Sequence, residues 1–119
     1  MRRREDDGAV TAETAAALPM LVIFTLSMAW LVSLGITQVR AIDAARETAR
    51  AAARSDGSAG AEALGHRVAP PGSSIQVARG PGTIVVTVRS PVGGPAGLFR
   101  PLSGFRVTGK AVAAVEPTR

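Results

Sequence analysis

The residues of this chain that could most clearly take part in chemistry lie at the start of a long apolar stretch. Glu13 is the last charged residue before that stretch, and a carboxylate at the edge of an apolar helix is costly to place in lipid. A nearby cation, or the positive N-terminal end of the helix dipole, makes the position tolerable. Because an unpaired buried charge is strongly penalised, such a glutamate can fix the register of its helix against a partner. The alternative interpretation is an ordinary acid at a helix start.

Two residues near Glu13 affect the backbone. Pro19 lacks an amide hydrogen and would clash with the carbonyl of Ala15, so we expect a kink in the helix there. Gly8 ends a polar segment at residues 1–8, which reads Met-Arg-Arg-Arg-Glu-Asp-Asp-Gly. The sequence thus places a glycine, an acid and a helix-bending proline at the entrance to one apolar run.

Composition argues against several classes of site. The chain has no cysteine and only one histidine, His66, which excludes disulfides and thiolate metal sites and leaves no partner for a histidine relay. No phosphate-binding loop and no Ser/His/Asp or paired-carboxylate arrangement is evident. The net charge of +5 comes mainly from scattered arginines, without an aromatic platform for bases. We therefore expect no enzyme activity, no cofactor, no metal, no small-molecule substrate and no nucleic acid.

The apolar run determines the class of protein. The 26 residues from Thr14 to Val39 carry no charge, and a bilayer core needs roughly 20 apolar helical residues. A cleaved secretory signal peptide would have a shorter apolar region followed by a small-residue cleavage site, which is not found before Arg40. We predict one helix over residues 9–54, whose first part is transmembrane.

The second part of this helix carries a stripe of small residues with a four-residue repeat, at Ala41, Ala45, Ala49 and Ala53. Asp43 and Glu47 stand three residues before Arg46 and Arg50, a spacing that favours ion pairs along a helix. One interpretation is a solvated helix with ordinary surface charge pairs. The other is a helix that packs closely against other helices through its alanines.

Residues 55–119 are expected to form a small exported domain. A short helix is expected at residues 61–68. Runs of β-branched residues bounded by Gly and Pro then predict three antiparallel strands, at residues 74–78, 83–89 and 105–115. The expected fold class is α+β, with a long N-terminal transmembrane α-helix followed by a small antiparallel sheet of about three strands.

A set of residues around the apolar run matches the N-terminal pattern of a known family at its characteristic spacing: Gly8, Glu13 and Pro19. The segment Ala-Ala-Arg-Glu-Thr-Ala-Arg at residues 44–50 and the Val-Thr-Val strand at residues 86–88 extend the match. The chain resembles the TadE-like minor pilins, or pseudopilins, of tight-adherence, type IV-like pilus systems. The resemblance covers residues 8–54 well and the remainder loosely, and Thr14 replaces the aromatic residue that usually follows the glutamate.

The resemblance implies a processing site and a role. In this family a prepilin peptidase cuts after a glycine before the helix, and the mature chain has a glutamate at its fifth position. For this chain the resemblance implies a leader at residues 1–8, cleavage between Gly8 and Ala9, and a contact between Glu13 and the new amino terminus of a neighbouring subunit. The implied partners are the membrane, prepilin peptidase, other pilin subunits and pilus assembly proteins, in adhesion or secretion.

The implied location is the cytoplasmic (inner) membrane, crossed once, with the N-terminus in the cytoplasm and the domain of residues 55–119 periplasmic or extracellular. Arginines flank both ends of the run, so orientation is taken from the resemblance rather than from charge. One alternative is an uncleaved single-pass envelope protein whose small domain binds a secretion or envelope partner. Another is a soluble or peripheral basic protein that binds nucleic acid or anionic lipid and buries the apolar helix in a complex.

Overall fold

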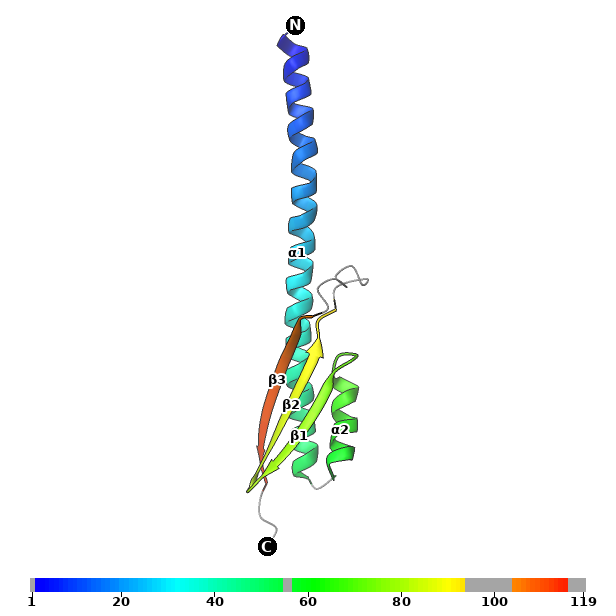
Figure 1. Cartoon of the computed structure of the whole chain (residues 1–119), viewed down its shortest axis with the longest axis vertical. Coiled ribbons are helices and arrows are strands. Elements are labelled where there is room, and N and C mark those ends of the chain that lie inside the picture. The colour runs from blue at the N-terminus through cyan, green and yellow to red at the C-terminus, as the bar shows by residue number, and fades with distance from the viewer. Residues whose placement is uncertain (1, 55–56, 94–103, 116–119) are drawn as a thin grey trace.

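The computed structural model describes residues 2–54, 57–93 and 104–115. They form, in chain order, α1 (Arg2–Ala53), α2 (Gly57–Val68), β1 (Ser74–Gly80), β2 (Thr83–Pro91) and β3 (Arg106–Ala114). Figure 1 shows α1 as a long rod, with the sheet and α2 lying along its C-terminal part. The molecule measures 93 × 20 × 18 Å. The expected α+β fold, with a long apolar N-terminal helix and a three-stranded antiparallel sheet, is confirmed.

Helix α1 begins at Arg2, seven residues before the predicted start at Ala9, so the polar segment is helical as well. Arginine and glutamate are good helix formers, and Glu5 in the first turn interacts favourably with the helix dipole. These preferences offset the cost of about 1 kcal/mol for a glycine inside a helix, here Gly8. Helix α1 continues through Pro19, and the kink stays a prediction.

The sheet has the strand order β1-β2-β3, with both pairs antiparallel. The β1–β2 turn at Pro81-Gly82 places Gly82 at φ 73°, a left-handed conformation that glycine adopts without a steric penalty. Strand β2 is central and alternates strictly, so that one set of side chains is buried against α1, namely Ile84, Val86, Val88 and Ser90. The other set faces away from the helices. The sheet therefore has an inner face on α1 and an outer face that no described element covers.

The core between α1, α2 and the sheet is unusual in the size of its side chains. Most of its buried apolar residues are alanines, and the larger ones come from β2 and the segment just after it, namely Ile84, Val86, Val88 and Val92. Small side chains allow close backbone approach. A Cβ placed on Gly109 of β3 would lie 2.5 Å from the carbonyl oxygen of Ala41 and 2.6 Å from the amide nitrogen of Ile42. Strand β3 therefore lies directly on the backbone of α1.

The alanine stripe packs within the chain's own domain, against the sheet as well as against a helix, α2. Ala41, Ala45 and Ala49 are buried, at 0 to 3% exposure, within the chain's own domain, where α1 packs against α2, β2 and β3. Of the two predicted ion pairs, the described residues show the one between Arg46 and Asp43, at 3.9 Å and exposed to solvent. Helix α2 begins at Gly57 rather than at Ala61, since the small residues before Ala61 do not stop it.

Candidate functional site

The first half of α1 is not covered by any part of the described structure. Every residue from 2 to 28 is exposed, and large apolar side chains point outward along this length, with Val10 at 62%, Met20 at 74% and Phe24 at 61% exposure. We call residues 9–28 the bare segment. Its 20 residues span about 30 Å as a helix, which equals the thickness of a bilayer's hydrocarbon core. Helix α1 is long and apolar enough to span a membrane, and none of its most apolar window is buried.

Hydroxyl groups along this apolar stretch are satisfied by the helix itself. Each donates a hydrogen bond of 2.8 to 3.1 Å to the carbonyl four residues earlier, in the pairs Thr14–Val10, Thr25–Leu21, Ser27–Ile23, Ser33–Ala29 and Thr37–Ser33. In hydrocarbon an unsatisfied polar group costs several kcal/mol. The internal bonds remove that cost for each of these side chains. The hydroxyl side chains of this stretch are therefore as compatible with an apolar environment as its apolar side chains are.

The predicted site residues lie together near the N-terminal end of α1, far from the sheet (Figure 1). Gly8 and Ala9 are exposed within the helix, and a Cβ added to Gly8 would touch nothing within 4 Å. Glu13 is exposed and makes no hydrogen bond or ion pair with any described residue. Pro19 sits six residues further along the same helix. The structure therefore leaves Glu13 available to a partner outside this chain and adds no contact that assigns its role.

A second feature, where the bare segment meets the domain, was missed by sequence reasoning. The ring of Phe105, just before β3, packs edge-on against Trp30 of α1 at 5.8 Å between centroids and 77° between planes. The side-chain amide of Gln38 donates to the carbonyl oxygen of Thr108 at 3.1 Å. We call this contact region the junction. The only sequence signal for it was Gly109 inside a strand, since such a glycine often marks a close backbone approach.

Aromatic residues at the junction match the composition of a membrane–water interface, where tryptophan is enriched. The structure packs Trp30 against the aromatic ring of Phe105 in the chain's own domain. Because the domain first covers α1 at residues 29 and 30, the junction marks the end of the bare segment.

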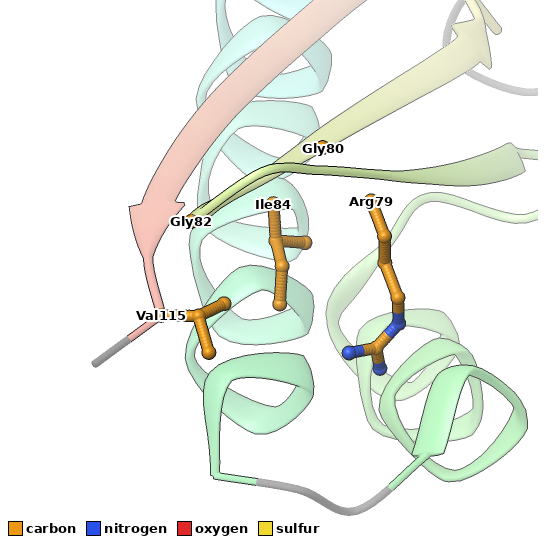
Figure 2. Close-up of a pocket in the computed structure, with 5 residues that line it drawn as sticks. All are labelled: Arg79, Gly80, Gly82, Ile84 and Val115. Carbon is orange, nitrogen blue, oxygen red and sulfur yellow. The ribbon is translucent and has the colours of Figure 1, made fainter. Parts of the chain in front are cut away.

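A shallow cavity of about 350 Å³ lies at the other end of the sheet, lined by Arg79, Gly80, Gly82, Ile84 and Val115. Figure 2 shows that the side chains of Arg79, Ile84 and Val115 extend from the strands toward the helices. Arg79 is the one charged group among otherwise apolar walls. No second polar side chain converges with it among the lining residues, so the cavity has no catalytic arrangement.

The exposed His66 does not belong to any cluster of metal-ligating residues within residues 2–54, 57–93 and 104–115. Comparisons with models of protein families, with curated proteins and with solved structures find no match to this chain. The candidate functional site is therefore defined by the chain's own features: the bare segment, the Gly8/Glu13 pair at its start and the junction at its end.

Proposed function

We propose that this chain is a minor pilin or pilus assembly protein of a tight-adherence, type IV-like pilus, with a structural and non-catalytic role. The observation that carries the proposal is the bare segment, which is uncharged from Thr14 onward, exposes its large apolar side chains and is uncovered by its own domain. A helix of this kind must be surrounded by lipid or by protein. A pilin helix has both environments in turn, since it sits in a bilayer before assembly and among the helices of other subunits afterwards.

The proposed location is the cytoplasmic membrane, crossed once, with the N-terminus in the cytoplasm and the sheet domain outside. Protease added to intact cells or spheroplasts tests this arrangement. We expect digestion of the domain of residues 57–115 and protection of the bare segment. Full protection of the domain until the membrane is lysed would place it in the cytoplasm and overturn the exported arrangement.

Processing at Gly8 is proposed from the resemblance and is supported by the exposure of the Gly8–Ala9 bond. N-terminal sequencing of the membrane-extracted protein should find a mature chain that starts at Ala9 when prepilin peptidase is active. Gly8→Val should block that cleavage. Gly35→Val is the matched control, because Gly35 is also helical and its Cβ position is also empty within 4 Å. An intact N-terminus in cells with active peptidase would contradict processing.

The proposed role of Glu13 follows from the length of the bare segment. If the domain edge at residue 29 stays at one membrane surface, residue 9 reaches the other after about 30 Å, and Glu13 lies about 6 Å inside it. A carboxylate at that depth is costly without a cation. The new amino terminus of a neighbouring subunit would supply the cation and set the register between the two helices.

Substitution at Glu13 tests this role. Glu13→Ala should leave membrane insertion intact and impair pilus assembly, measured as subunits incorporated into sheared pili. Glu5→Ala is the matched control, because it removes an acid from the same helix, within the leader that processing removes, and should leave assembly normal. Normal piliation in Glu13→Ala cells would overturn the register role. If substitutions at Gly8 and Glu13 change neither processing nor insertion nor assembly, the result would favour the uncleaved single-pass envelope protein instead.

A further inference from the structure

The outer face of the sheet carries positive charge without any acid to balance it. Outward-facing side chains alternate with the buried ones on β2 and β3, and three of them are exposed cations, Arg89, Arg106 and Lys110. Among the described strand residues, none of the outward positions holds Asp or Glu. None of the three cations takes part in an ion pair with a described residue. The face therefore presents a positive potential to whatever lies beside it.

Strand register places these cations close to one another. Arg89 on β2 stands opposite Thr108 on β3, and Arg106 lies two residues before Thr108. Diagonal positions of this kind are roughly 7–8 Å apart in an antiparallel pair, so Arg89 and Arg106 can act on one ligand. Lys110 lies four residues beyond Arg106, about 14 Å along the strand. Lys110 is also diagonal to Arg89, two residues past Thr108, but it lies on the side away from Arg106 and from the bare segment.

Arg106 lies at the level where the domain meets the bare segment, and Arg89 lies further along α1. Arg106 directly follows Phe105, whose ring packs on Trp30. Arg89 stands opposite Thr108, whose carbonyl accepts a hydrogen bond from Gln38, about 13 Å beyond residue 29 along α1, so its guanidinium reaches the headgroup layer with the side chain extended toward the membrane. If the bare segment spans the hydrocarbon core, this end of the sheet stands beside the headgroup layer. Figure 1 shows the same relation, with the start of β3 and the end of β2 pointing along α1 toward its N-terminal half.

We propose that Arg89 and Arg106 form a binding site for the phosphate of an anionic phospholipid in the leaflet next to the domain. A guanidinium binds a phosphate oxygen pair through two parallel hydrogen bonds, and two guanidinium groups at this separation can clamp one headgroup. The site would hold the sheet upright against the membrane surface. The proposal rests on the bare segment spanning a bilayer and is independent of leader cleavage, of pilus assembly and of which side of the membrane the domain occupies.

The chain's single tryptophan, Trp30, gives a direct measurement because it lies at the junction. The full chain is reconstituted in vesicles of phosphatidylcholine that contain a fixed fraction of lipid with brominated acyl chains, which quench tryptophan. The brominated lipid is phosphatidylglycerol in one series and phosphatidylcholine in the other. We expect stronger quenching of Trp30 by the anionic lipid. The preference is the ratio of the local enrichment of phosphatidylglycerol to that of phosphatidylcholine, and each arginine should raise it by up to about fivefold. Added sodium chloride should weaken that preference because it screens the charges.

Matched variants separate a site from overall charge. Arg89→Gln and Arg106→Gln should each reduce the preference by up to about fivefold, and the double variant should retain only what Arg40, directly after the charge-free run, contributes. Lys110→Gln removes the same charge from the same face but beyond the headgroup layer. Arg79→Gln removes it beside the β1–β2 turn, at the opposite end of the sheet from Arg106. Neither control should change the preference, and all variants should keep the parent's circular dichroism and Trp30 emission maximum.

Three outcomes would overturn the proposal. Equal quenching by the two brominated lipids in the parent chain would show that no anionic lipid is enriched at the junction. A loss of preference in the Arg79 or Lys110 control as large as in the Arg106 variant would assign the effect to net charge. Abolition of the preference by millimolar inorganic phosphate would identify a free-anion site in place of a lipid site. A mature chain starting at Ala9 alongside any of these results would leave the proposed pilin function standing.

Discussion

The contact of Gly109 with α1 allows a sharp test of how the domain is held to its helix. A Cβ at this position would meet backbone atoms of Ala41 and Ile42 at 2.5 to 2.6 Å, where non-bonded heavy atoms normally stand about 3.5 Å apart. Gly109→Ala therefore forces the strand and the helix to move apart by about 1 Å. No rotamer change relieves the contact, because the opposing atoms are helix backbone.

The cost of Gly109→Ala follows from this separation. Overpacking of a well-packed core costs about 1–3 kcal/mol, and we place this substitution near 3 because the backbone must move. Alanine gains roughly 0.5–1 kcal/mol over glycine in a strand interior. The net loss in free energy of unfolding is then about 2 kcal/mol, which corresponds to a drop in Tm of roughly 8–16 °C for a domain of this size.

Thermal unfolding of the full chain in detergent micelles measures this effect, followed by Trp30 emission and far-UV circular dichroism. Gly93→Ala is the control, because a Cβ at Gly93 touches nothing within 4 Å, and its Tm should stay within about 2 °C of the parent. Adding Ala41→Gly to Gly109→Ala should not restore the Tm, since the clash involves the backbone of Ala41. An unchanged Tm in Gly109→Ala, or rescue by Ala41→Gly, would refute the reasoning.

Two further substitutions test other contacts of the domain. A Cβ on Gly65 would overlap the hydroxyl oxygen of Thr48 and lie 2.9 Å from the δ-carbon of Ile75, so Gly65→Ala should lower the Tm by several degrees. Thr48→Ala should restore part of that loss in a double-mutant cycle. Simple additivity of the two substitutions would contradict the contact. Phe105→Ala removes the edge-on ring contact with Trp30, worth about 0.5–1.5 kcal/mol beyond buried area; it should shift the emission maximum of Trp30 in detergent, and an unchanged spectrum would mean that the ring does not shape that environment.

The sequence predicted the strands more accurately than the long helix. Val86 and its neighbours alternate in burial and are β-branched, and Pro81-Gly82 supplies the turn, so local preferences and packing agree. The start of α1 was misjudged by seven residues, because charged residues such as Arg2 and Glu5 are compatible with helix and with a polar leader alike. A composition that suits both states cannot locate a boundary.

The site was predictable at one end and not at the other. Glu13 and Gly8 were identified because they interrupt a pattern, and a charge beside an apolar run is visible in any listing of the residues. The junction depends on contacts across 70 positions or more, such as Gln38 with Thr108. Helical periodicity showed that Ala41 and its companions share a face, but it does not determine whether a second subunit or the chain's own sheet covers them.

The alanine-rich core has a consequence for how this domain folds. Alanine methyls bury little area, while ordering each residue costs about 1–2 kcal/mol of backbone entropy, and a free helix must also overcome unfavourable nucleation. With the bare segment in a bilayer, its backbone hydrogen bonds cannot be exchanged for bonds to water, so the helix is already formed when residues 40–53 are added to it. The helix that continues from the bare segment is then a preformed surface on which the sheet folds. A chain that started at Gln38 would keep the alanine core and would still have to nucleate that helix in water.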